Sequence, residues 1–328
     1  MKVTLQPSGA VLETLPGEAI LAAAQRLGYS GPHSCRNGNC QLCAALLVEG
    51  QVDQRGQTAD HGEIYVCVAV PLTDCLLQWD GVLAPGELPV RTLACQVVAL
   101  DDVGGDVRRV RLRAPAGRPP RYHAGQYLMI ARDDGKQSAF SLASAPHQGR
   151  ELELHVLARE ASSQALLAQL ERKGMAQVEL PYGDAHLAEL PDGPLVLIAA
   201  GTGMAQMHSL IEDARTRGFA HPVHLYWGVR TPEDFYAIEA WDDWASLPNL
   251  VLNRVVSDAC GWEGRCGLLH EVVRADFADL SGLHVYASGS PAMVYATLDA
   301  LVEAGMDAHQ MRADGLRLRT AELAPWSR

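Results

Sequence analysis

The chain has 328 residues, of which 48% are hydrophobic and 20% charged, and its formal net charge at pH 7 is −12. This length predicts two or three globular domains, and the acidic balance argues against nucleic-acid binding, which requires a basic surface. No apolar run approaches the roughly 18 residues of a membrane helix, and the first residues lack the apolar segment of a signal peptide. We therefore expect a cytoplasmic protein with no membrane partner, whose cysteines outside any metal site stay unpaired, namely Cys75, Cys95, Cys260 and Cys266.

The first part of the chain has the pattern of a small mixed sheet. Residues 3–5 and 11–15 predict a hairpin, and residues 18–27 predict a helix because apolar side chains recur there at helical spacing. Returning strands follow after a polar loop. This order predicts a β-grasp domain over residues 1–87.

The loop between that helix and the returning strands contains Cys35, Cys40 and Cys43, separated by four and then two residues. This is the spacing of plant-type [2Fe–2S] clusters, in which a fourth thiolate comes from further along the chain. Cys67, at the end of an apolar run, is the expected fourth ligand, and its competitor Cys75 is more simply a core residue. A zinc site built from paired Cys-x-x-Cys units and a redox Cys-x-x-Cys pair are the alternatives, and neither explains Cys35.

A Pro- and Gly-rich linker at residues 85–89 precedes a region of different character. Over residues 90–190 short strands with alternating apolar residues, clearest at 151–156, are broken by glycine and proline turns. One helix, at 164–173, interrupts them. This pattern predicts an antiparallel β-barrel.

The pattern changes again over residues 191–328. A buried-type strand is followed by a turn of Gly201, Thr202 and Gly203 and then by a helical stretch, 205–217. Glycines let a backbone approach a phosphate, and the helix N-terminus offers free N–H groups to it. The same alternation occurs three times more, which predicts a doubly wound parallel sheet.

Together, the cysteine loop, the barrel pattern and the glycine-rich turn resemble the ferredoxin–NAD(P)H reductase fusions of the oxygenase reductase family, and the chain is also similar to the CDP-6-deoxy-3,4-glucoseen reductases. The resemblance implies a multidomain α+β and α/β protein with a plant-type [2Fe–2S] ferredoxin domain, an FAD-binding β-barrel and an NAD(P)-binding Rossmann-like domain. It implies an oxidoreductase that passes electrons from NADH, NADPH being possible, through FAD and the cluster to an oxygenase component or its intermediary ferredoxin. We expect a monomer. A reductase for a nucleotide-deoxysugar dehydratase, a flavin reductase and a redox-sensing protein are the alternatives.

The resemblance assigns roles in the flavin-binding strands. In the family an arginine begins the second of these strands and holds the flavin phosphate, whereas this chain has Ser138 there. Phe140 matches the aromatic residue that packs on the flavin ring, and Ser141 matches the hydroxyl that bonds the reactive edge. A serine cannot replace a charged fork, so we expect FAD to be held less tightly unless Arg132 or Lys136 compensates.

Further cofactor contacts are expected from the same resemblance and from the glycine-rich turn. For the flavin these are Tyr127, Ala139, His155, Val156, Ser162 and Ser163; for the nucleotide and its surroundings they are Gly201, Thr202, Gly203, Gly228, Arg230, Ser288, Gly289 and Asp314. Ser162 and Ser163 are expected where a helix N-terminus meets the pyrophosphate, with an ordinary N-cap as the alternative. Asp314 matches an acidic position near the flavin in some relatives, and an exposed aspartate is its alternative.

Ser141 and Ser288 are the expected catalytic residues. The family usually has cysteine where Ser288 stands and proline where Gln206 stands. Asp234 follows Arg230 by four residues, and a carboxylate at that place would repel a 2′-phosphate. The sequence therefore favours NADH over NADPH.

Overall fold

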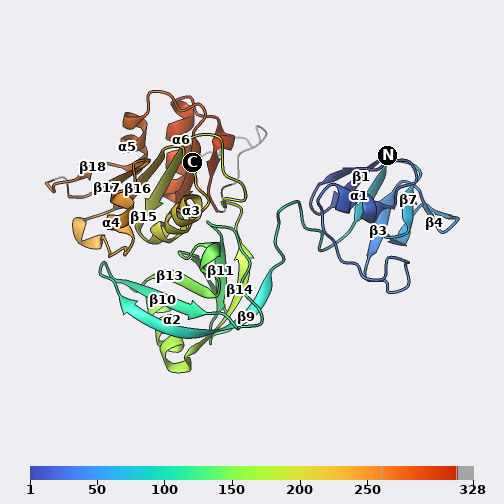
Figure 1. Ribbon diagram of the computed structural model, residues 1–328, viewed down its shortest axis with the longest axis horizontal. Coiled ribbons are helices and arrows are strands. Elements are labelled where there is room, and N and C mark those ends of the chain that lie inside the picture. Colours follow the sequence, from blue (N-terminus) through green and yellow to red (C-terminus); the bar gives the residue numbers. More distant parts are fainter. Residues whose placement is uncertain (260, 315, 317–328) are drawn as a thin grey trace, which may run out of the picture. The chain divides into compact units, whose positions relative to one another are not determined.

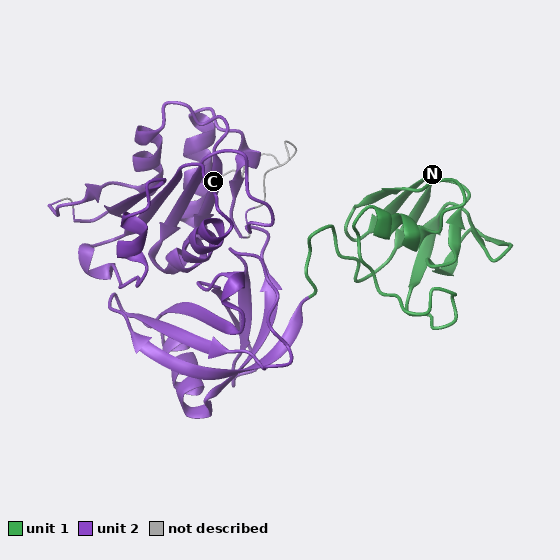
Figure 2. Cartoon of the chain, viewed as in Figure 1, with its two compact units in different colours: residues 1–89 green, residues 90–328 purple. Residues whose placement is uncertain are grey.

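Two units make up the protein, Met1–Pro89 and Val90–Arg328 (Figure 2). The structure is a computed structural model that describes residues 1–259, 261–314 and 316. Among these residues, none of the helices has the length and apolar character that crossing a bilayer requires.

The first unit is built on a five-stranded sheet of order β2-β1-β8-β3-β6, with a small second sheet of order β5-β4-β7 and helix α1 (Ile20–Arg26) (Figure 1). The strands are β1 (Lys2–Gln6), β2 (Val11–Glu13), β3 (Ala44–Glu49), β4 (Val52–Gln54), β5 (Gln57–Ala59), β6 (Gly62–Tyr65), β7 (Ala69–Pro71) and β8 (Cys75–Gln78). Strand β1 pairs antiparallel with β2 and parallel with β8. Val3 and Leu5 of β1 are fully buried and alternate with outward-facing residues, as a half-buried strand requires.

An antiparallel six-stranded sheet of order β12-β11-β14-β9-β10-β13 begins the second unit. Its strands are β9 (Arg91–Asp102), β10 (Val107–Arg113), β11 (Tyr127–Ala131), β12 (Gln137–Ser141), β13 (Glu151–Leu157) and β14 (Met175–Tyr182). Helix α2 (Ala161–Lys173) buries Leu166 and Leu170 in the core that this sheet encloses. The sheet curls into the near-barrel that the alternating pattern predicts (Figure 1).

A wholly parallel sheet of order β18-β17-β16-β15-β19-β20 completes the unit. Its elements are β15 (Leu195–Ala200), α3 (Met204–Thr216), β16 (Val223–Val229), α4 (Trp241–Ala245), β17 (Leu250–Val256), β18 (Arg265–Cys266), α5 (Leu269–Asp276), β19 (His284–Ser288), α6 (Pro291–Glu303) and β20 (Met311–Arg312), with single 3-10 turns at Pro146–Gln148, Gly201–Gly203, Pro232–Asp234 and Ala308–Gln310. The chain leaves β15 toward β18 on one side and returns to β19 on the other. Ligands bind at such a switch point, beyond the carboxyl ends of the strands.

The cysteines outside the predicted cluster loop do not all behave as expected. Cys75 and Cys95 are free and buried, which agrees with packing roles. Cys266 is disulfide-bonded, so the prediction that it is unpaired is wrong; that prediction rested on the expected compartment and not on local geometry. Cys260 lies outside the described residues.

Candidate functional site

The cysteine loop brings its sulfur atoms together in two pairs. The Sγ atoms of Cys43 and Cys67 are 3.2 Å apart. Cys35 and Cys40 each donate a backbone N–H to the other's sulfur, at 3.5 and 3.3 Å. The structure thus brings Cys67 to Cys43 of the loop, 24 residues away in the sequence. Within the described residues no three His, Cys, Asp or Glu side chains surround a single point as the ligands of one ion would.

The backbone around these sulfurs is shaped to donate hydrogen bonds to them. Arg36, Gly38 and Gln41 have positive φ angles of 57°, 73° and 61°. The N–H groups of Asn37 and then Cys40 lower the pKa of Cys35 to about 6, and the N–H of Gly38 also bonds the sulfur of Cys67. Burial outweighs that bond and raises the pKa of Cys67 to about 11, so iron must displace its proton. Thiolate donors supported by backbone N–H groups fit an iron–sulfur cluster.

A cavity of about 370 Å³ separates strand β12 from the carboxyl end of β19. It is lined on the antiparallel side by Tyr127, Ala139, Phe140 and Ser141, and on the parallel side by Gln206, Ala287, Ser288, Gly289, Val294 and Asp314. The two predicted catalytic residues, Ser141 and Ser288, therefore face the same space. Gln206 was not predicted as a site residue.

An adjoining cavity of about 370 Å³ shares Ala139, Phe140, Ser141, Ser288 and Gly289 with the first and adds the predicted residues His155, Ser163, Thr202 and Gly203. A third, of about 460 Å³, shares Leu157, Ala200, Thr202 and Ser290 with this second cavity and contains the predicted residues Gly201, Gly228 and Arg230. The three cavities are therefore neighbours that share walls. Together they extend from strands β11 and β12 to the ends of β15 and β16.

Glycine is required at two positions beside these cavities where the backbone closely approaches other atoms. A Cβ atom at Gly203 would lie 2.3 Å from the carbonyl oxygen of Ser288, and one at Gly228 would lie 2.7 Å from Leu269. Gly201 has a φ of +53°, which a residue with a side chain rarely adopts. The glycines thus let the turn after β15 approach the end of β19, and let β16 approach the start of α5, beside the space that a dinucleotide needs.

Three of the predicted residues do not line these cavities. The hydroxyl of Ser138 accepts a hydrogen bond from Arg132 Nη1 at 3.4 Å. Val156 is fully buried in the core of the antiparallel sheet. The exposed Ser162 donates its hydroxyl to the carboxylate of Glu160 at 3.3 Å, and no side chain caps the N-terminus of α2.

Asp314 is half-buried and lines the cavity near Ser288. It accepts hydrogen bonds from the N–H groups of Asp184 and Ala185 at 3.1 and 3.2 Å. Burial is the largest effect on this carboxyl group, and it raises the pKa of Asp314 to about 6. The alternative of an exposed, solvated aspartate does not describe it.

Two carboxylates near Arg230 have different roles, and only one of them pairs with it. Asp234 accepts hydrogen bonds from the backbone N–H and hydroxyl of Thr231, at 3.0 and 3.3 Å, and forms an ion pair with Arg159. It therefore closes a turn. Asp258, at the end of β17, forms the ion pair with Arg230 at 2.8 Å.

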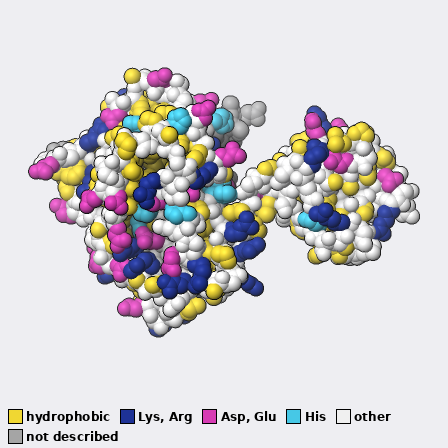
Figure 3. Space-filling model, in the orientation of Figure 1, with side chains coloured by type: hydrophobic (Ala, Val, Ile, Leu, Met, Phe, Trp, Pro, Cys, Tyr) yellow, Lys and Arg dark blue, Asp and Glu magenta, His cyan; other side chains and the backbone are white. Residues whose placement is uncertain are grey.

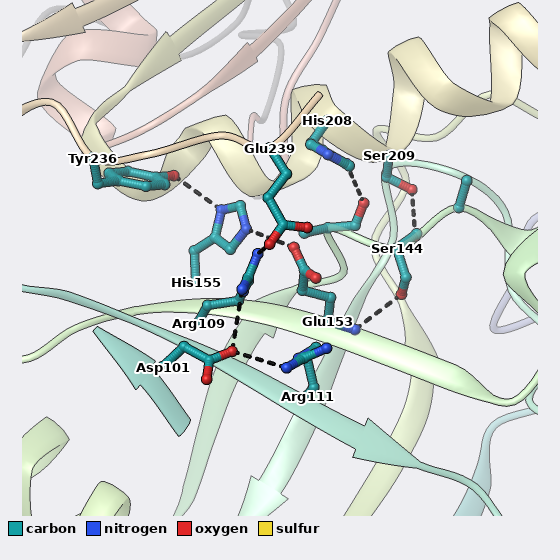
Figure 4. A network of polar contacts seen from close by, with 12 residues as sticks. Asp101, Arg109, Arg111, Ser144, Glu153, His155, His208, Ser209, Tyr236 and Glu239 are labelled. Carbon is teal, nitrogen blue, oxygen red and sulfur yellow. Dashed lines mark hydrogen bonds and ion pairs between the residues drawn. The ribbon is translucent and has the colours of Figure 1, made fainter. Parts of the chain in front are cut away.

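Polar side chains tie the antiparallel sheet to the parallel-sheet half beside this space (Figure 4). His155 lies between the two halves, with Nδ1 at 3.0 Å from the hydroxyl of Tyr236 and Nε2 at 3.1 Å from Glu153. From α3, His208 Nδ1 lies 2.9 Å from the carbonyl oxygen of Ala143. The hydroxyl of Ser209 donates to the backbone carbonyl oxygen of Ser144 at 2.8 Å. Sequence patterns cannot reveal these contacts, because the partners lie up to 81 residues apart.

Comparison with known proteins agrees with this geometry. Residues 3–72 match the 2Fe-2S iron-sulfur cluster binding domain, and residues 197–299 match the oxidoreductase NAD-binding domain. The chain is therefore an NAD-binding oxidoreductase with an iron–sulfur domain. The predicted fold class is confirmed.

Similarity extends over nearly the whole chain. The reductase component of phenol 2-monooxygenase from Pseudomonas sp. (strain CF600) is 32% identical, covering 92% of this chain and 90% of its own. The CDP-6-deoxy-L-threo-D-glycero-4-hexulose-3-dehydrase reductase of Yersinia pseudotuberculosis is 30% identical, covering 96% and 98%. The crystal structure of an Amycolatopsis cytochrome P450 reductase superposes with a TM-score of 0.64 at 26% identity, covering 95% and 98%.

This chain belongs to the family of iron–sulfur reductases that contains these oxygenase components and dehydrase reductases. As a member it is an electron-transfer oxidoreductase that works with a [2Fe–2S] cluster, FAD and a nicotinamide nucleotide.

Proposed function

We propose that this chain accepts electrons from NADH in the adjoining cavities between β12 and the ends of β15 and β19, and delivers them singly through its iron–sulfur domain to an oxygenase component or an intermediary ferredoxin. The observation that carries the proposal is the shared lining of the three cavities. Ser288 and Gly289 border the same space as Phe140 and Ser141, and Thr202 borders the adjoining nucleotide-sized space.

FAD, when bound, supplies the conversion from a two-electron donor to a one-electron acceptor. The protein's residues bind and orient the reactants. Phe140 would pack against the flavin ring and Ser141 would donate a hydrogen bond to it. The turn Gly201–Gly203 and the N-terminus of α3 would hold the pyrophosphate of the nucleotide, and Ser288 would lie beside the nicotinamide.

The cluster would be held by Cys35, Cys40, Cys43 and Cys67. Their paired sulfur atoms and the surrounding N–H donors support this assignment. We assign the cluster to a domain of residues 1–87, the flavin to 90–190 and the nucleotide to 191–328.

NADH is the proposed donor because of Asp258. This carboxylate already neutralises Arg230, which lines the proposed nucleotide cavity, and the other arginine of that lining, Arg159, is paired with Asp234. A 2′-phosphate would therefore meet a paired arginine and a negative charge. NADPH remains the alternative donor that the experiment must compare.

The acceptor is proposed from the relatives and from charge. Several relatives are reductase components of oxygenases, including that of a terephthalate 1,2-dioxygenase from Comamonas sp., 28% identical over 95% of this chain. Residues 1–87 contain four Lys and Arg against nine Asp and Glu, a net charge of 4 − 9 = −5, which suits a basic docking face. On the visible face of the second unit both signs are interspersed (Figure 3).

The dehydrase reductase of Yersinia pseudotuberculosis, at 30% identity over 96% of this chain, supports a second candidate. In that case the acceptor would be a dehydratase acting on a nucleotide-linked deoxysugar. We further propose a cytoplasmic, monomeric protein, which fractionation and gel filtration would test.

Anaerobic purification tests the proposal directly. The protein is expected to contain about two irons and two acid-labile sulfides per chain, to bind FAD, and to be reduced by NADH. Stoichiometric zinc without sulfide, or no reduction of bound flavin by either nucleotide, would contradict it. Assays with an oxygenase component and with a sugar dehydratase then distinguish the two acceptors.

A further inference from the structure

Gln206 lies in the first turn of α3, directly after the glycine-rich turn, and only 1% of it is exposed. Its side-chain Nε2 donates two hydrogen bonds, to the carbonyl oxygens of Gly125 and Ala185, each at 2.9 Å. Gly125 comes two residues before β11, and Ala185 lies in the segment that connects the antiparallel sheet to the parallel one. One amide group therefore joins the nucleotide-side helix to the backbone just before β11 and just after β14, two neighbouring strands of the flavin-side sheet.

The same side chain lines the cavity that contains Ser141 on one wall and Ser288 on the other. The packing around it leaves little freedom to move. A Cβ atom at Gly125 would lie 2.6 Å from the carbonyl oxygen of Ala185 and 3.0 Å from Leu210 of α3. Loss of the amide would thus leave two buried carbonyl groups without a donor at the point where the walls meet.

The connecting segment is held from a second direction. Asp314 accepts the backbone N–H groups of Asp184 and Ala185 and borders the same cavity. Ala185 is therefore fixed through its N–H by Asp314 and through its carbonyl oxygen by Gln206. The position of the parallel-side wall relative to the flavin-side wall depends on both bonds.

We propose that Gln206 is a positioning residue that sets the separation between the flavin wall and the nicotinamide wall of this cavity. The inference rests on the proposed function, since it takes this cavity as the place where nicotinamide and flavin meet. Productive hydride transfer needs reacting atoms about 3–3.5 Å apart, and a shift of about 1 Å costs roughly a hundredfold in rate.

Ser209 provides a matched control. It lies one turn further along α3, is fully buried, and also donates a hydrogen bond to a carbonyl oxygen of the antiparallel half, that of Ser144 at 2.8 Å. It does not line the cavity. Ser209→Ala removes a hydrogen bond of the same kind between the same two halves, but it does not change the lining of the cavity between Ser141 and Ser288.

The experiment compares Gln206→Met, similar in length but unable to donate, with Ser209→Ala in the full-length holoprotein. Flavin affinity is measured by fluorescence quenching, the flavin environment by visible circular dichroism, and flavin reduction by rapid mixing with NADH. We expect both variants to keep flavin affinity and the NADH concentration dependence within about threefold. Only Gln206→Met is expected to change the flavin dichroism and to lower the limiting reduction rate by roughly tenfold to a hundredfold.

A wild-type reduction rate in Gln206→Met, or an equal loss in Ser209→Ala, would overturn the proposal. If the methionine variant does not fold, Gln206→Asn keeps an amide that is one methylene shorter. It is expected to reduce flavin more slowly than wild type, and an unchanged rate would contradict the inference. Failure of the wild-type chain to bind flavin at all would instead contradict the proposed function.

Discussion

Arg132 occupies the place where a phosphate contact is missing. Its guanidinium group lies 3.4 Å from the hydroxyl of Ser138, and only 17% of its side chain is exposed. We propose that Arg132, just after β11, supplies the cation that the family supplies from position 138; its ion-pair partner is Asp134 at 3.3 Å.

We predict that Arg132→Gln weakens FAD and FMN binding but leaves riboflavin binding unchanged, because riboflavin has no phosphate. A charge-assisted bond contributes about 1.5–3 kcal/mol, so the dissociation constants should rise by roughly one to two powers of ten. Fluorescence titration measures them. The exposed Lys136→Gln serves as the control, and equal losses for riboflavin would show that the effect is structural.

Asp314 makes stability depend on pH. Its pKa is about 6 in the folded chain against an ordinary value of 3.8, so the folded state favours the protonated form. The contribution of the Asp314 carboxyl group to the free energy of unfolding is greatest below pH about 4 and is lost as the pH rises through 6. The charged form thus destabilises the second unit by up to about 3 kcal/mol at pH 8.

We predict that Asp314→Asn, whose side-chain oxygen can still accept the two N–H groups, stabilises the apoprotein at pH 8 and by about half as much at pH 5. Denaturant unfolding of the second unit at the two pH values measures this difference. A gain that is equal at both values would mean that the carboxyl group does not titrate as described.

The roles of some site residues could be predicted from their neighbours in the sequence, and the roles of others could not. The cysteine spacing is a sequence-local signal, and Cys67 lies against Cys43 of the loop as predicted. The roles of Gln206 and Asp258 depend on partners 21 to 81 residues away, so no pattern in the sequence indicated them. Asp234 lines the same cavity as Arg230, and its partner Arg159 comes from a segment 75 residues distant.

At the scale of elements, periodicity predicted the helices and strands better than their ends. The helix expected at 164–173 begins at Ala161. Its N-cap residue, Glu160, makes no side-chain capping bond, so no capping signal in the sequence marks this end. The parallel sheet was predictable since each strand is followed by a helical pattern. The edge strand β18 is only two residues long and has no periodicity to detect.

The ends of β16 and β17 carry a prediction about nucleotide choice. Asp258→Asn removes the charge that neutralises Arg230, so we expect kcat/KM for NADPH to rise about tenfold while that for NADH changes little. Steady-state reduction of ferricyanide with each nucleotide measures the ratio. In contrast, Asp234→Asn disrupts the turn at Thr231 and should lower both values alike. An unchanged NADPH value in Asp258→Asn would contradict the role given to this ion pair.

For the whole molecule, the division into two units predicts separable activities. Cys43→Ser removes a proposed cluster ligand that lies in the first unit, whereas the cavities lie wholly in the second. NADH should still reduce ferricyanide at a near wild-type rate, because that acceptor takes electrons from flavin. Reduction of cytochrome c or of the partner should fall steeply.

The matched control for this variant is Cys75→Ser, which changes a buried cysteine of the same unit outside the loop. It should leave the visible spectrum of the cluster and both activities in place. Partner reduction at the wild-type rate by Cys43→Ser would remove the cluster from the electron path. Partner reduction by the wild type should also weaken as salt screens the acidic first unit.

The hydrophobic cores also follow this division, since the core around Val3, Leu5 and Trp79 contains only residues of the first unit. Damage to one part therefore need not spread to the other. An oxidant that destroys the iron–sulfur centre would leave a folded, nucleotide-consuming remnant. In a cell under oxidative stress such a remnant would continue to spend reducing power without delivering it, so repair or removal of the damaged chain would matter more than its loss of activity alone suggests.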